Sequence, residues 1–126
     1  MPQSGNLNDI NNLRVALLSD FLLFTRVMFE KLTGRPFMMS QPAGNESHFI
    51  TMAKVFTKAF LLDAPRILLN CPPGWSKSQM CKSFIAWTMA HYPDSKFMYI
   101  SYSHDLAAMH THSIRQMMMM PIYREL

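Results

Sequence analysis

Lys77 and Ser78 are the residues of this chain whose types and position are best suited to chemistry. They follow a short apolar run at 66–69 and a Cys-Pro-Pro-Gly stretch at 71–74, and a helical pattern begins with them. The order strand, tight loop, helix is typical of a phosphate-binding loop, in which backbone N–H groups and the helix N-terminus bind anionic oxygens. In such a loop the lysine contacts the β- and γ-phosphates and the next hydroxyl binds Mg²⁺.

The loop departs from the usual pattern G-x-x-x-x-G-K-[ST] at both glycines. Counting back from Lys77, Cys71 stands at the first glycine position and Ser76 at the second, and Gly74 lies between them. An ordinary strand-to-helix turn is therefore the alternative interpretation. Two features favour a phosphate site. A lysine at the positive end of a helix dipole is unfavourable unless an anion is present, and Ser78 follows where a metal-binding hydroxyl belongs.

The composition indicates one folded domain. The chain has 126 residues, of which 49% are hydrophobic and only 16% are charged, so general disorder is excluded. The net charge of +4 permits a polyanionic partner without requiring one, because the basic residues are scattered. The 13 methionines include the block 117–120, which is either plastic core filler or an exposed, adhesive end.

The two cysteines and the apolar segments bear on the cellular setting. Cys71 and Cys81 have neither the spacing of a zinc site nor the number of a disulfide framework, and a reducing cytoplasm is the simplest setting. The polar start at 1–6 does not have the pattern of a signal peptide. The apolar stretch at 16–24 contains polar residues and is too short to span a bilayer, so no membrane association is expected.

Hydrophobic periodicity predicts two helices before the loop. Residues 1–8 are expected to form a flexible leader, followed by a helix over 9–32 that Gly34 ends. A second helix is predicted from about 45 to 62, after a loop rich in proline and glycine. The likeliest role of the first helix is that of a scaffold, since its apolar positions follow the spacing of one buried face.

The loop itself lies within a predicted βαβ unit. The runs 66–70 and 97–101 have the composition of buried strands, and a helix over 77–91 lies between them. The two strands of a βαβ unit are parallel and joined by a right-handed crossover. We therefore expect an α/β fold of the P-loop NTPase type.

The remainder of the chain completes this expected domain. Ser103 is predicted to cap a last helix, which ends before Pro121. The predicted domain thus consists of N-terminal helices at 9–64 and a βαβα unit at 65–126. Its helices would pack on a small parallel sheet.

The remaining ionisable residues do not indicate a second kind of chemistry. His110 and His112 are two positions apart on a predicted helix and face different sides, so they cannot bind one ion together, and no acidic cluster accompanies them or His104. No arrangement indicates a nucleophile triad. None of the aspartates follows an apolar strand with a second acid, so the Walker B carboxylates that hold Mg²⁺ are not recognised.

The residues around the loop resemble the large terminase subunit of tailed bacteriophages. The matching segments are Cys-Pro-Pro-Gly-Trp-Ser-Lys-Ser at 71–78, Tyr-Pro-Asp at 92–94, Ser-Tyr-Ser at 101–103, Asp-Leu-Ala at 105–107, Arg115 and Tyr-x-x-Leu at 123–126. The similarity runs over about 41–126, and its central block is 66–107. Proteins of this family are ATP-driven motors that package viral DNA into a procapsid and carry a separate nuclease domain.

The resemblance implies an incomplete P-loop ATPase domain over 9–126, with ATP and Mg²⁺ as cofactors. It implies nucleotide-binding residues at Pro73, Gly74, Trp75, Ser76, Lys77 and Ser78. Lys77 would be the phosphate lysine and Ser78 the Mg²⁺ ligand. His48 would lie on the adenine side, and the alternative interpretation of His48 is a histidine on a helix surface.

The resemblance also implies partners and a location. The partners are double-stranded viral DNA, the small terminase subunit and the portal protein, and a homo-oligomer is an open alternative. The location is the cytoplasm of the host cell, for a chain encoded by a phage or prophage.

Several departures from the family bear on activity. The family's loop arginine is Gly74 here, its loop histidine is Trp75, and the glycine before the lysine is Ser76. Loss of an arginine that stabilises the phosphoryl transition state lowers the rate by orders of magnitude. Since the sequence also ends before the family's acidic strand, coupling motif and nuclease, we expect nucleotide binding without turnover. The alternatives are a non-catalytic fragment that docks on packaging or capsid proteins, and a different small P-loop enzyme such as a kinase.

Overall fold

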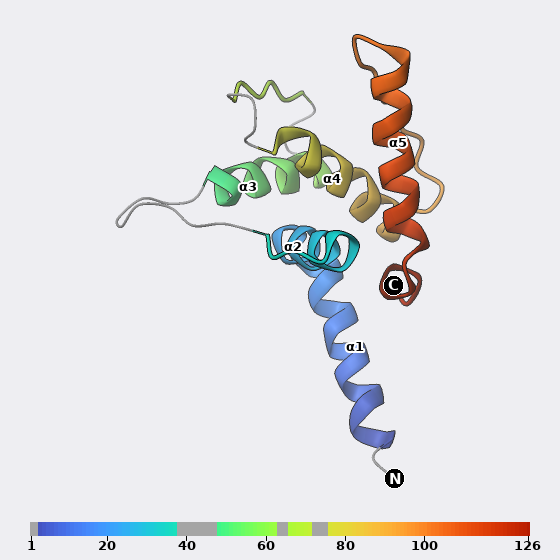
Figure 1. Cartoon of the computed structure of the whole chain (residues 1–126). Coiled ribbons are helices and arrows are strands. Elements are labelled where there is room, and N and C mark those ends of the chain that lie inside the picture. The colour runs from blue at the N-terminus through green and yellow to red at the C-terminus, as the bar shows by residue number, and fades with distance from the viewer. Residues whose placement is uncertain (1–2, 38–47, 63–65, 72–75) are drawn as a thin grey trace.

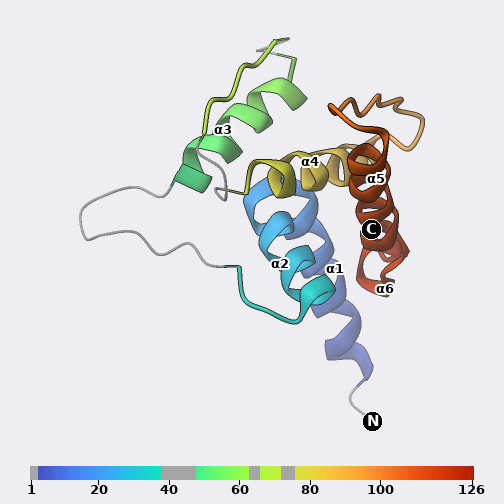
Figure 2. The ribbon, with the colours of Figure 1, turned by 45° about the horizontal axis from the view of Figure 1, so that its top comes forward.

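The computed structural model describes residues 3–37, 48–62, 66–71 and 76–126. The described residues form six helices, shown in Figure 1: α1 (Gln3–Ser19), α2 (Phe21–Thr33), α3 (His48–Phe60), α4 (Lys77–His91), α5 (His104–Met119) and the short α6 (Pro121–Arg124). Helix α4 contacts α1, α2, α3 and α5, so it is the element on which the others pack. Figure 2 shows α3 on one side of α4 and α5 on the other.

The prediction of an α/β fold was wrong, because the described residues contain no strand and no sheet. The segments 66–70 and 97–101, predicted as parallel strands, are irregular and form no backbone hydrogen bond with another described residue. In Figures 1 and 2 the first lies beside α3 and the second beside α5, so they cannot pair. An apolar run becomes a strand only where a second backbone pairs with it, and these two runs pair with no other segment in the part of the chain that the structure describes.

The helix predicted over 9–32 is divided in two at Asp20. The Asp20 backbone is extended (φ −126°, ψ 105°), and its carboxylate accepts hydrogen bonds from the N–H groups of Leu22 and Leu23 at 3.1 and 3.2 Å. This is an N-cap, which satisfies donors at the start of α2. Helix α1 begins at Gln3, so residues 3–8 are helical where a flexible leader was predicted.

The other helix boundaries largely follow the prediction. Gly34 ends α2 in the left-handed conformation (φ 72°), and its N–H donates to the Glu30 carbonyl at 2.8 Å. Ser103 caps α5, since its hydroxyl accepts from the Leu106 N–H at 3.1 Å. Helix α4 has the predicted bounds, and α3 begins at His48, directly after residues that lie outside the described ranges.

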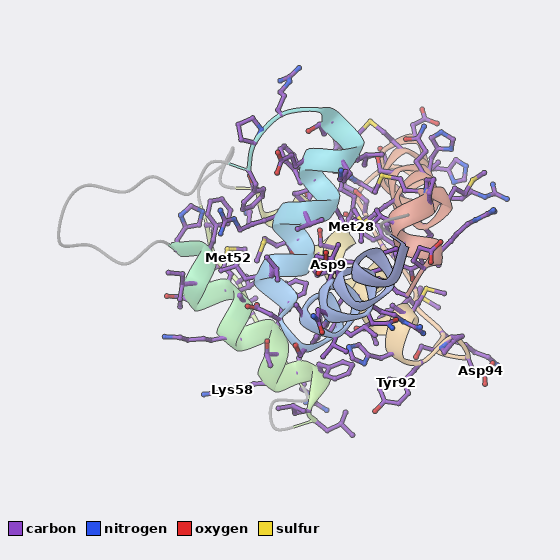
Figure 3. The ribbon with its side chains drawn as sticks, turned by 90° about the horizontal axis from the view of Figure 1, so that it is seen from below. Asp9, Met28, Met52, Lys58, Tyr92 and Asp94 are labelled. Carbon is purple, nitrogen blue, oxygen red and sulfur yellow. The ribbon has the colours of Figure 1, made fainter. Side chains whose placement is uncertain are left out.

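The core is an aromatic and methionine-rich cluster between α2, α3 and α4. Phe24 and Met28 are fully buried, and the Phe21 ring lies 5.4 Å from the Trp87 ring between centroids. Figure 3 shows Met28 near the centre of the molecule and Lys58 and Asp94 at its rim. The members are Leu17, Phe21, Phe24, Met28, Phe49, Met52, Ala53, Phe56, Met80, Ala86, Trp87 and Met117.

Three long-range hydrogen bonds connect α4 to α1 and α6, and one of them joins His91 Nε2 to the Leu18 carbonyl at 2.6 Å. The Trp87 indole N–H donates to the Leu17 carbonyl at 3.1 Å, and the Tyr123 hydroxyl donates to the Ala86 carbonyl at 2.8 Å. The methionine block 117–120 is partly core filler and partly exposed surface. Met117 is buried in the core, while Met119 is 60% exposed. Within the described ranges, no helix is long and apolar enough to cross a membrane.

Candidate phosphate site at the start of helix α4

Helix α4 begins with Lys77, and the residue before it has an unusual backbone. Ser76 is in the left-handed region (φ 62°, ψ 30°), and its side chain does not cap the helix. This conformation costs a residue with a Cβ atom about 1–2 kcal/mol and suits glycine, the residue of the usual phosphate-loop pattern at this position. The local backbone therefore retains a glycine-type geometry although the glycine itself is missing.

The Lys77 side chain reaches back over the loop. Its ammonium Nζ donates a hydrogen bond of 2.8 Å to the carbonyl of Cys71, the residue on the other side of the loop. A lysine ammonium has three N–H donors, so this bond leaves two for another acceptor. The first N–H groups of a helix point out of its N-terminus and carry a partial positive charge. Lys77 and these amides together provide cationic donors at one place.

Ser78, the predicted Mg²⁺ ligand, has an aromatic neighbour from a distant segment. The Ser78 side chain lies close enough to the Tyr99 phenol to lower its pKa. Burial raises the pKa of the Tyr99 phenol, the Cys81 thiol raises it further, and the contact with Ser78 opposes these effects. Burial also raises the pKa of the Cys81 thiol against the opposing charge of Lys77, so this cysteine stays protonated and is a poor nucleophile.

Lys82 and His110 extend the polar cluster from the Tyr99 side. The His110 ring lies 5.4 Å from the Tyr99 ring between centroids, and its buried Nδ1 atom has no hydrogen-bond partner among the described residues. Burial lowers the pKa of His110, and the charge of Lys82 lowers it further. Burial likewise lowers the pKa of the Lys82 ammonium. Burial at this cluster thus disfavours the protonated, charged forms of His110 and Lys82.

Three of the six predicted nucleotide-binding residues lie within the described part of the chain. Ser76, Lys77 and Ser78 lie at the start of α4, whereas Pro73, Gly74 and Trp75 lie outside the described residues. His48 is the first residue of α3, and its ring lies 4.0 Å from the neighbouring Phe49 ring between centroids. The role of His48 on the adenine side stays a prediction.

Sequence reasoning missed the contribution of Tyr99 and His110. Tyr99 was placed inside a buried strand, and His110 was weighed only as a metal ligand. The position of Tyr99 beside both Ser78 of α4 and His110 of α5 depends on the packing of α5 against α4, which no local pattern contains.

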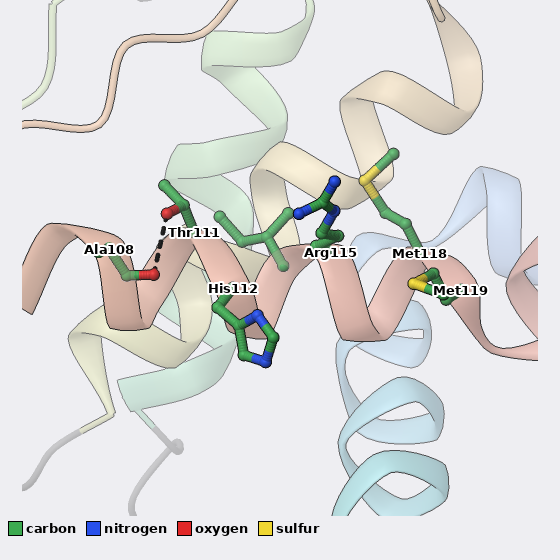
Figure 4. Close-up of a pocket in the computed structure, with 7 residues that line it drawn as sticks. Ala108, Thr111, His112, Arg115, Met118 and Met119 are labelled. Atoms are coloured by element: carbon green, nitrogen blue, oxygen red, sulfur yellow. Dashed lines mark hydrogen bonds between the residues drawn. The ribbon is translucent and has the colours of Figure 1, made fainter.

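A groove of about 580 Å³ lies elsewhere, on the surface of α5 (Figure 4). It contains none of the predicted nucleotide-binding residues. Its wall includes the Thr111 hydroxyl, which donates to the Ala108 carbonyl at 3.0 Å and is thereby occupied within the helix. The lining residues are Ala108, Thr111, His112, Ile114, Arg115, Met118 and Met119.

The chemistry available at the start of α4 is binding of an anion. Among the residues that the structure describes, no group of three or more His, Cys, Asp or Glu is placed to hold a metal ion. A Mg²⁺ ion there would take Ser78 as its protein ligand and fill its other positions with water and phosphate oxygens, as this ion commonly does.

Comparisons of the chain with protein-family models, with curated proteins and with solved structures gave no match.

Proposed function

We propose that this chain binds the phosphates of ATP at the start of α4, as part of a viral DNA-packaging motor of the large terminase type. The observation that supports the proposal is the position of Lys77. Its ammonium is held across the loop by the Cys71 carbonyl, beside a helix N-terminus that no described side chain caps. An anion at this point would meet the positive end of the helix dipole and two remaining ammonium donors.

The other residues take the roles that the terminase resemblance implies. Ser78 binds Mg²⁺ through its hydroxyl, and the backbone N–H groups of 74–77 surround the phosphates. His48 lies toward the adenine. In this proposal the contact between Tyr99 and Ser78 orients the serine hydroxyl, so Tyr99 is a positioning residue.

The proposed chain binds nucleotide without hydrolysing it. Hydrolysis in P-loop ATPases needs a carboxylate that holds Mg²⁺ and a residue that orients the attacking water. The sequence offers no such pair of acids after an apolar segment. Translocation of double-stranded viral DNA in the host cytoplasm would be carried out by the whole motor, with the small terminase subunit and the portal protein as partners.

Calorimetric titration with Mg-ATP tests this proposal. We expect saturable binding that Lys77→Ala weakens by about 10- to 100-fold, because a hydrogen bond to a charged group is worth about 1.5–3 kcal/mol. Lys58→Ala is the matched control, because Lys58 is an exposed lysine on α3. Equal affinities of the two variants, or no binding by a folded chain, would overturn the phosphate site.

A docking fragment is the second candidate function, and the α5 groove is the observation that favours it. The groove exposes Met119 next to Met118 and Arg115, and methionine adapts well to the surface of a partner. In this case purified portal protein or small terminase subunit should bind the chain. Met119→Glu should abolish that binding, and Lys77→Ala should leave it unchanged.

A further inference from the structure

Residues 97–102 alternate between two faces. Met98, Ile100 and Tyr102 are 85%, 81% and 93% exposed, whereas Tyr99 and Ser101 between them are partly buried. Tyr99 lies against His110 of α5, so Tyr99 faces the protein, whereas Met98, Ile100 and Tyr102 point into solvent. Phe97 at the start of the segment departs from the alternation and is 42% exposed. Successive side chains of an extended segment point to opposite sides, which explains the alternation. We call Phe97, Met98, Ile100 and Tyr102 the apolar strip.

The apolar strip is as large as the largest apolar patch on a typical monomer. From their exposed fractions, its four residues present roughly 600 Å² to solvent, backbone atoms and the Tyr102 hydroxyl included, which is at the upper end of the largest apolar patch on a typical monomer. No charged residue interrupts 97–103. Figures 1 and 2 show this segment alongside α5. The strip is therefore accessible to a large partner.

We infer that the apolar strip is the contact surface of a homodimer, in which a second copy packs the same four residues against it. A two-fold axis lets one patch serve both subunits, because each residue then meets its equivalent or a neighbour. The two strips together would bury roughly 1,200 Å², the lower end of the range for specific interfaces. This inference does not depend on the proposed nucleotide site.

The charges at the two ends of the strip fit an antiparallel arrangement. Lys96 precedes the strip and Asp105 follows it, and both are exposed. Neither forms an ion pair with a residue in the described part of the chain. When two strips run in opposite directions, Lys96 of each copy lies near Asp105 of the other. The arrangement thus places opposite charges at both ends and apolar residues between them.

Sedimentation equilibrium of the full chain tests the homodimer. We expect a dimer that forms at about 10–100 µM, in keeping with a small interface. The double variant Met98→Lys/Ile100→Lys should weaken it at least tenfold, and it should keep the helical circular dichroism because both side chains are exposed. Leu68→Lys is the control, since Leu68 is 86% exposed in the other irregular segment. A chain that stays monomeric up to about 1 mM would overturn the inference. The inference would also be overturned if the dimer dissociated in the Leu68→Lys variant, which leaves the strip intact.

A charge reversal tests the antiparallel arrangement. Lys96→Asp would place two carboxylates together at each end, and we expect about threefold weaker dimerisation, as for exposed ion pairs. Adding Asp105→Lys reverses both members and should restore the original affinity. If the double reversal weakens the dimer more than Lys96→Asp does, the two strips do not run antiparallel.

Discussion

Ser76 and Ser103 each stand directly before a long helix, and their backbones differ. Ser103 is extended and accepts a hydrogen bond from the Leu106 N–H, whereas Ser76 is left-handed and its side chain caps nothing. The first arrangement stabilises α5 as an ordinary N-cap does. In the second arrangement the first N–H groups of α4 remain free for another partner, and the left-handed backbone of Ser76 is strained. At this scale the left-handed backbone of Ser76 is the feature, among the described residues, that the candidate site shares with the glycine position of a phosphate loop.

The substitution Ser76→Gly is expected to stabilise the folded chain. Glycine adopts φ 62° without the clash of a Cβ atom, and this gain outweighs the added freedom of the unfolded chain. The net gain should be about 0.5–1 kcal/mol in the free energy of unfolding, measured by urea denaturation.

In the same urea denaturation, Ser103→Ala should change the free energy of unfolding in the opposite direction. Loss of the side-chain cap of α5 should lower the free energy of unfolding by about 1 kcal/mol. If Ser76→Gly destabilises the chain as well, the left-handed conformation of Ser76 is not the native one.

Acidification should weaken the fold through His110. Burial and the charge of Lys82 lower the pKa of His110 from its ordinary value of 6.5, so the unfolded chain binds the proton more tightly than the folded chain does. The stability from neutral His110 is therefore present above pH 6.5 and is lost as the pH falls below it. Urea midpoints between pH 5 and 8 measure this effect. His110→Gln should flatten the profile, whereas the same change at exposed His112 should not.

At the scale of elements, helices could be predicted from the sequence and the strands could not. A helix satisfies its backbone within one segment, so caps such as Gly34 and Ser103 can be recognised locally. A strand needs a partner segment, and the apolar runs at 66–70 and 97–101 say nothing about whether one is present. The division at Asp20 was missed because the apolar periodicity continues across it, while one carboxylate decides the cap.

Asp20→Ala should remove the cap that separates α1 from α2. Its two hydrogen bonds would be lost, and the free energy of unfolding should fall by about 1 kcal/mol. Asn also caps helices well, so Asp20→Asn should retain most of that stability. Equal losses in both variants would show that the charge matters and the cap does not.

At the scale of the whole molecule, α4 unites the core with the candidate site. Its first residue is Lys77, and its last turns carry Ala86 and Trp87, which are hydrogen-bonded to Tyr123 and Leu17. Lys77 and Ser78 belong to a local sequence pattern, and their role in binding phosphate stays a prediction. Tyr99 could not, because it reaches Ser78 only after the chain has folded.

Trp87→Phe should destabilise the molecule more than Tyr123→Phe does. The first change leaves the buried Leu17 carbonyl without its donor and shrinks a core side chain, which should lower the free energy of unfolding by about 2–3 kcal/mol. The second removes one partly buried hydrogen bond worth about 1 kcal/mol. Thermal unfolding of the two variants compares them, and a smaller effect of Trp87→Phe would contradict the central position of α4.

Amide hydrogen exchange with and without Mg-ATP tests the proposed phosphate site and the helical scaffold together. Without nucleotide, the amides of 66–70 and 97–101 should exchange rapidly at low protein concentration, because they have no backbone partners among the described residues. With Mg-ATP, the amides of Lys77, Ser78 and Gln79 should become protected, and Lys77→Ala should abolish that protection. Slow exchange at 66–70 and 97–101 without nucleotide, or unchanged exchange at the start of α4 with it, would contradict this description.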